Sequence, residues 1–127
     1  MEDQKQYLTL NSIEAYTSAF KLSNKVWDVV AIWENFARQT IGKQFVRAID
    51  SISANIAEGF GRFHKREKVQ FYRIAKASAV ESLDWNQKAK TRNLLNESDY
   101  NFIFAELKEL PRLINTLIKF TNDKLKH

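Results

Sequence analysis

The scarcity of turn-forming residues constrains this chain more than any other feature of its sequence. Only three glycines and one proline occur in 127 residues. A domain of short strands needs a turn roughly every 8 to 12 residues, and glycine and proline supply many of the backbone conformations of such turns. We therefore expect helices. The length is that of a single domain with one core.

Apolar residues recur at helical spacing in four segments of the chain. This pattern predicts helices over about residues 12–35, 41–60, 65–92 and 98–124. Four long amphipathic helices with short links are typical of an all-α, antiparallel up-down-up-down four-helix bundle, here one domain over residues 1–127. Pro111 falls inside the last segment, and we expect it to bend that helix rather than divide it.

The first segment carries two apolar stripes about 100° apart around the helix. We assign one stripe to the core: Ile13, Tyr16, Phe20, Trp27 and Val30. The other stripe, with apolar residues on the outer side of the last segment, predicts an oligomer interface: Leu22, Val26, Val29, Trp33, Phe102, Leu113 and Phe120. A wider core within one subunit is the alternative explanation of the second stripe on the first segment.

The remaining helices each show one main apolar stripe, and these stripes define the rest of the expected core. In the second helix the stripe consists of Phe45, Ile49, Ile52, Ile56 and Phe60. In the third it consists of Phe71, Ile74, Ala75, Ser78, Ser82, Trp85 and Ala89. In the fourth it consists of Tyr100, Ile103, Leu107, Leu110, Ile114, Leu117 and Ile118. The small residues of the third helix favour close helix packing.

Several function classes find little support in the composition. The chain has no cysteine and two histidines, His64 and His127, far apart in the sequence. The chain therefore cannot form disulfides or use a thiol nucleophile, and it has too few histidines for a histidine-based metal site. We expect no metal, no cofactor and no enzymatic activity. No signal peptide or long apolar run is present, so we expect a cytoplasmic protein without a membrane role.

Polar residues along the second helix follow spacings of three and four residues. This polar ladder consists of Gln44, Arg47, Ser51, Asn55 and Glu58. One hypothesis makes it a ligand groove with Glu58 as acid or base. We favour a structural role, in which Glu58 pairs with Arg62 four residues later and Asn55 or Arg47 bonds across helices. A general base needs a nucleophile or metal partner, and the sequence offers none.

Positive charge is concentrated in one part of the chain, whose formal net charge is +5. Residues 62–96 hold nine basic and three acidic side chains. Five cations there form a predicted basic stripe, nearly opposite the expected core stripe of the third helix: Arg62, Lys65, Arg66, Arg73 and Lys76. Such a stripe can neutralise phosphates of RNA or DNA, although a solvated basic face is the commoner occurrence. His64 is interpreted as a surface residue rather than a general acid.

One stretch resembles a known family. It contains Gln44, Arg47, Ala48, Ser51 and Ile52, then the run Asn55 to Arg62, and later Phe71, Ala75, Ser78 and Glu81. This pattern resembles the four-helix-bundle 23S ribosomal RNA intervening-sequence proteins. The resemblance implies an up-and-down bundle from a bacterial cytoplasm, a ring-like homopentamer, and no established enzymatic activity. Accessory proteins of diversity-generating retroelements look similar in shape and bind nucleic acid.

The chain departs from the family pattern at two places. The family usually has a proline-containing link between its first two helices, where this chain reads Trp33 to Ala37. It also has a glycine where Ala77 stands.

These observations leave three functional hypotheses. The first is a non-enzymatic homo-oligomer, a pentamer by resemblance, whose basic surface binds RNA or DNA. The second is a protein interaction scaffold without a nucleic-acid role, in which the outer apolar stripes receive a partner helix. The third, an RNA-cleaving enzyme, requires His64 or Glu58 to be catalytic and is the least supported of the three.

Overall fold

A computed structural model describes residues 9–126, and this part of the chain is helical with no strand. The four long helices are α1 (Glu14–Ala31), α3 (Lys43–Phe60), α4 (Lys65–Thr91) and α5 (Glu97–Lys124). A short 3-10 turn, Leu10–Ser12, precedes α1, and a single turn α2 (Asn35–Ala37) continues through a π-helical turn, Arg38–Gly42, into α3. The prediction of an all-helical, single compact domain is confirmed.

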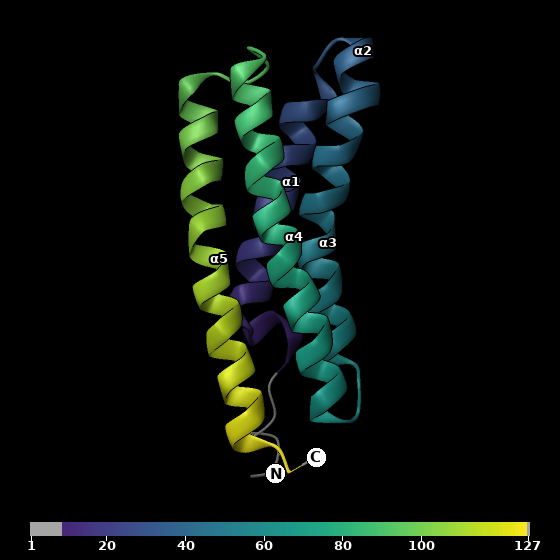
Figure 1. The fold of residues 1–127 in the computed structure, drawn as a ribbon, viewed down its shortest axis with the longest axis vertical. Coiled ribbons are helices and arrows are strands. Elements are labelled where there is room, and N and C mark those ends of the chain that lie inside the picture. Colours follow the sequence, from purple (N-terminus) through teal and green to yellow (C-terminus); the bar gives the residue numbers. More distant parts are fainter. Residues whose placement is uncertain (1–8, 127) are drawn as a thin grey trace.

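The long helices lie side by side as a bundle (Figure 1). Both α1 and α4 pack against α3 and α5, so the order around the bundle is α1, α3, α4, α5. Figure 1 shows the α1–α3 and α4–α5 connections at the upper end and the α3–α4 connection at the lower end. The α1–α3 side is therefore opposite the α4–α5 side.

The link between α1 and α3 has no proline at its start. The side chain of Glu34 caps α2 there instead. Its carboxylate accepts hydrogen bonds from the backbone N–H of Phe36 at 2.9 Å and of Ala37 at 2.7 Å. These are N–H groups that the first helical turn leaves without partners. The residues from Trp33 to Ala37, which depart from the family pattern, thus provide a capped turn.

Gly42 lets α1 and the start of α3 approach closely. A Cβ at Gly42 would lie 2.8 Å from Val30 Cγ1 and 3.1 Å from the backbone oxygen of Ala37. Glycine is required there because any side chain would push α1 away from the π-helical turn.

The α3–α4 connection is held by a lysine from the first turn of α4. Lys68 Nζ donates to the backbone oxygen of Phe60 at 2.8 Å, at the end of α3. Partial burial lowers the pKa of Lys68. A cation at the C-terminal carbonyls of a helix is favourable because it opposes the negative end of the helix dipole.

The core of α3 and α5 agrees with the sequence pattern. Phe45, Ile49, Ile52 and Ile56 are fully buried in α3, and Ile103, Leu107 and Ile114 are fully buried in α5. The predicted core stripe of the first helix is wrong in part, because Phe20 and Trp27 are exposed. α1 instead buries Ala15, Ala19, Leu22 and Val26, so that it packs tightly between α3 and α5.

The core face of α4 is also displaced from its predicted arc. Ile74 is exposed, and Phe71 and Trp85 are half-buried, whereas Val69 and Tyr72 are buried. α4 packs against both α3 and α5, and the buried Tyr72 meets Gly59 of α3. Ala77, the other departure from the family pattern, is exposed.

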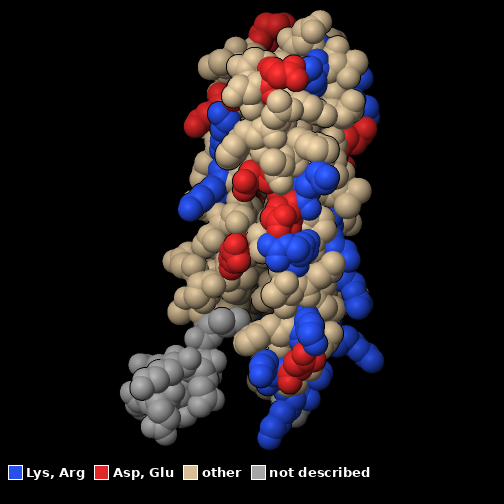
Figure 2. Space-filling model, turned by 90° about the vertical axis from the view of Figure 1, so that its left-hand side faces the viewer, with Lys and Arg blue, Asp and Glu red and all other residues tan. Residues whose placement is uncertain are grey.

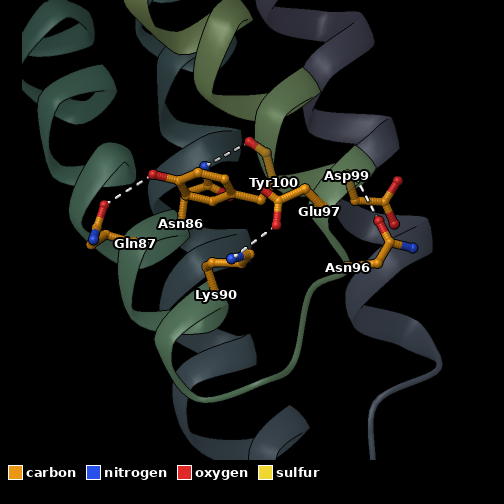
Figure 3. A network of polar contacts seen from close by, with 7 residues as sticks. All are labelled: Asn86, Gln87, Lys90, Asn96, Glu97, Asp99 and Tyr100. Atoms are coloured by element: carbon orange, nitrogen blue, oxygen red, sulfur yellow. Dashed lines mark hydrogen bonds and ion pairs between the residues drawn. The ribbon is translucent and has the colours of Figure 1, made fainter.

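A polar network joins α4 to the start of α5 (Figure 3). The buried Asn86 donates to the backbone oxygen of Tyr100 at 3.2 Å, and the Tyr100 hydroxyl donates to Gln87 at 3.0 Å. Asn96 caps α5 by accepting from Asp99 N at 2.7 Å. From there α5 passes through Pro111 without a break.

Candidate interaction surfaces

The residues of the polar ladder on α3 have different environments: some form hydrogen bonds, across helices or within α3, and others face the solvent. Ser51 Oγ and Ser78 Oγ of α4 lie 2.9 Å apart, and Asn55 Nδ2 donates to Ser51 Oγ at 2.9 Å and to Ser51 O at 2.8 Å. Ser51 therefore makes the contact across helices that we expected of Asn55 or Arg47, and Asn55 bonds within α3. Arg47 is exposed and Gln44 half-buried.

Glu58 and Arg62 form the expected ion pair, with 2.8 Å between Oε2 and Nη2. The Arg62 guanidinium also lies over the Phe71 ring, 4.7 Å from its centroid. His64 is exposed at the N-terminus of α4, and its ring meets Phe63 edge-on. Neither Glu58 nor His64 is placed beside a nucleophile by these contacts.

The predicted basic stripe does not form one outward-facing row. Lys65 Nζ donates to the backbone oxygens of Asn122 at 3.3 Å and Leu125 at 3.1 Å, at the end of α5. Lys76 Nζ donates to Asn115 Oδ1 of α5 at 3.1 Å. With Arg62 held by Glu58, only Arg66 and Arg73 of this set are exposed and have no hydrogen-bonding or ion-pairing partner among the described residues. Figure 2 shows Lys and Arg gathered along one edge and at the lower end of the α5 side.

The predicted oligomer interface is wrong for most of its residues. Leu22 is 2% exposed, Val26 is 0% exposed, and Trp33 and Leu113 are also buried, while Val29 is half-buried against the core. The wider intramolecular core covers them, since α1 uses this stripe to pack against α3 and α5. Phe102 and Phe120 remain exposed.

Exposed apolar side chains occupy two different flanks of the bundle. On α1, Phe20 is 49% exposed and its ring contacts Tyr16 at 5.9 Å between centroids. We call this pair the α1 flank. On the opposite side, Phe104 stacks on Tyr100 at 6.0 Å, and Val80 is 57% exposed. These three residues form the α4–α5 flank.

The assignment of each flank follows from helix geometry. Phe20 lies seven residues before Trp27, and thus on the same side of α1, and Trp27 lines a hollow with Val46 of α3. Val80 lies seven residues before Gln87, which bonds Tyr100 of α5. The α1 flank therefore borders α3, and the α4–α5 flank lies across the bundle from it.

Cations and aromatic rings also meet at the end of the bundle that carries α2. Two hollows lie on either side of the start of α3. One, of about 530 Å³, separates α1 from α3, and the other, of about 670 Å³, separates α2 and α3 from the end of α4. This site could not be found from the sequence, because its residues come from α1, α2, the π-helical turn, α3 and α4 and follow no single periodicity.

Within the described residues, no group of three or more His, Cys, Asp or Glu side chains is arranged to hold a metal ion. None of the helices in this part of the chain is long and apolar enough to cross a membrane.

The family model of the 23S rRNA-intervening sequence proteins matches residues 11–116. The chain belongs to this family. A crystal structure of a protein with unknown function from the S23 ribosomal protein family of Bacteroides thetaiotaomicron VPI-5482 is similar, with a TM-score of 0.73 and 19% sequence identity. The similarity covers 83% of this chain and 98% of that chain, and at this identity it shows the fold alone. A search of curated proteins finds no match.

Proposed function

We propose that this member of the intervening-sequence protein family is a non-enzymatic scaffold that assembles with copies of itself. The observation that carries this proposal is the pair of exposed apolar flanks on different sides of the bundle. In a heterologous ring, each subunit uses two different surfaces, and the first surface of one subunit binds the second surface of its neighbour. The α1 flank and the α4–α5 flank provide two such surfaces.

The aromatic content of these flanks supports burial by a partner. Phe20 and Phe104 expose ring surface that would be covered in an interface, and aromatic residues are enriched at the centres of interfaces. Exposed Phe102 and Phe120 add apolar surface on the side of α5 toward α1, since Lys25 of α1 lies over the Phe102 ring and Phe120 lines a hollow with Ala15. The number five comes from the family resemblance and not from any distance in the molecule.

Light scattering tests the assembly. The wild-type mass should be several times 14.9 kDa, and five times that value for a pentamer. Phe20→Glu and Phe104→Glu should each yield smaller, folded species, because both positions are exposed in the subunit. Ile32→Glu is the matched control, since Ile32 is 85% exposed and lies beyond the end of α1, outside both flanks. A wild-type mass of one subunit at micromolar concentration would contradict self-assembly and favour a scaffold that binds a different protein.

Nucleic-acid binding is a second proposed function, favoured by the formal net charge of +5. Arg66 and Arg73 are exposed and unpaired in the described part of the chain, and oligomerisation would multiply every such cation. Titration with RNA and DNA at several salt concentrations tests this function. Failure to bind either polymer at 50 mM salt would exclude it.

A further inference from the structure

The two hollows beside α2 share a common wall. Gln39 of the π-helical turn and Lys43 of α3 line both of them. The first hollow is completed by Trp27 of α1 and Arg47 of α3, and the second by Phe36 of α2 and Arg92 after α4. Together they form one surface that crosses the end of the bundle from α1 to α4, which we call the double groove.

Cations dominate the charged lining of the double groove. Its five basic residues are Arg38, Lys43, Arg47, Lys88 and Arg92. Of the described residues that line either hollow, none is an aspartate or a glutamate. Lys88 is paired with Asp84 at 2.6 Å, and Arg38 donates to Trp33 O and Asn35 Oδ1. Lys43, Arg47 and Arg92 are exposed and have no hydrogen-bonding or ion-pairing partner within residues 9–126.

Aromatic rings are interleaved with these cations. Trp27 is 61% exposed and Phe36 is 73% exposed. Trp85 forms part of the wall of the second hollow, where its indole N–H donates to Glu81 at 2.9 Å and Lys88 lies 4.6 Å from its ring centroid. The rings of Trp27 and Phe36 are accessible on the surface, whereas Trp85 is fixed by its neighbours.

We infer that the double groove binds single-stranded nucleic acid, with bases stacked on Trp27 and Phe36 and phosphates held by Lys43, Arg47 and Arg92. Cationic grooves with exposed aromatic rings are typical of single-strand binding, because unpaired bases offer faces for stacking. Bases inside a duplex are already stacked on one another, so the exposed rings favour a single strand. The inference rests on the proposed nucleic-acid function and moves it from the predicted basic stripe to the other end of the bundle.

Charge reversal separates the double groove from the stripe. The groove variant is Lys43→Glu, Arg47→Glu and Arg92→Glu, and the control variant is Lys21→Glu, Arg66→Glu and Arg73→Glu, which changes the net charge equally at exposed positions. The probe is a fluorescently labelled 20-nucleotide oligo(dT) or oligo(U), titrated at several salt concentrations. We expect the groove variant to bind at least tenfold more weakly and with a salt slope reduced by about 2, since each lost phosphate contact on a single strand removes about 0.7. The control variant should lose less than threefold.

The outcomes distinguish the inference from the proposed function. If the wild type binds no nucleic acid, both fail. If the control variant loses binding and the groove variant keeps it, nucleic-acid binding stands and the double groove is not the site. Circular dichroism of both variants should match the wild type, and Lys43→Gln, Arg47→Gln and Arg92→Gln replace the reversals if it does not.

Stacking gives a second, independent readout. Trp27→Ala and Phe36→Ala should each weaken oligo(dT) binding about tenfold without changing the salt slope, because they remove stacking and no charge. An abasic strand with the same number of phosphates should bind the wild type at least tenfold more weakly than oligo(dT). Equal binding of the abasic strand, of a duplex or of poly-glutamate would show a site for negative charge alone and overturn the inference.

Discussion

Gly59 of α3 and Tyr72 of α4 lie so close that no side chain fits between them. A Cβ at Gly59 would be 2.8 Å from Tyr72 Cε1 and 2.9 Å from the backbone oxygen of Lys68. Tyr72 is 2% exposed, so its ring has little freedom to move away. The family resemblance depends on the run Asn55 to Arg62, and the first of its two glycines, Gly59, is thus explained by a close contact between α3 and α4.

Replacement of Gly59 therefore tests this contact. Gly59→Ala should lower the free energy of unfolding by about 1–3 kcal/mol, the usual cost of forcing extra volume into a packed core. Gly61→Ala is the control, because its Cβ would meet nothing closer than 3.6 Å and the backbone φ of −79° suits alanine. Urea unfolding of both variants measures the difference. Equal stability of Gly59→Ala and wild type would mean that the helices are not so close.

The same tyrosine predicts a pH dependence of stability. Burial raises the pKa of Tyr72 to about 12 from its ordinary value of 10.0, although a hydrogen bond with Thr121 opposes part of the rise. The folded state therefore favours the neutral phenol. This contribution to stability is fully present below pH 10 and is lost as the pH rises through about 12.

Unfolding at several pH values can isolate this contribution. Between pH 9 and pH 11.5 the wild type should lose more stability than Tyr72→Phe, which has no phenol to ionise. Parallel loss in the two proteins would show that lysine deprotonation, not Tyr72, governs alkaline unfolding.

The second apolar stripe of α1 offers a direct test of which face is the core. Val26→Asp places an unpaired charge at a fully buried position and should abolish folding or lower the free energy of unfolding by more than about 4 kcal/mol. Ile32→Asp, at the end of the same helix, 85% exposed and outside both flanks, should change it by less than about 1 kcal/mol. Thermal melting followed by circular dichroism compares them. A folded Val26→Asp protein of reduced oligomeric mass would return Val26 to the subunit interface.

The sequence was sufficient for the four long helices but not for their rotation, and it did not predict the end of α1 at Ala31, the turn α2 or the π-helical turn Arg38–Gly42. In α3 and α5 a single stripe of large apolar residues, such as Phe45 and Leu107, identifies the buried face. α1 carries two apolar stripes, and the buried face is the one that contains Ala15 and Ala19. Their small side chains allow close packing but contribute little to an apolar pattern in the sequence. A periodicity based on large apolar residues therefore assigns Phe20 to the core, although Phe20 is exposed.

The double groove could not be predicted for a different reason. Its shape depends on the π-helical turn, the cap at Glu34 and the close approach at Gly42, which are backbone features set by tertiary packing. Lys43 and Arg92 lie 49 positions apart in sequence and line the same hollow only once α3 and α4 are packed. The basic stripe, by contrast, could be recognised from spacing along one helix. The sequence could not show that Lys65 and Lys76 donate hydrogen bonds to α5.

The Ser51–Ser78 hydrogen bond decides whether the polar ladder is structural. Both hydroxyls lie in the α3–α4 contact, 2.9 Å apart, and Asn55 supports Ser51 from one turn later. A double-mutant cycle of Ser51→Ala and Ser78→Ala should give a coupling energy of about 0.5–1.5 kcal/mol, since removal of one hydroxyl leaves the other without its partner. The cycle of Ser53→Ala with Ser78→Ala is the control: Ser53 lies two residues further along α3 and donates no hydrogen bond to α4 within the described part of the chain. Its coupling should be close to zero. A ladder that instead served a ligand would show additive stability effects in both cycles, and that result would reopen the ligand-groove hypothesis for Ser51 and Glu58.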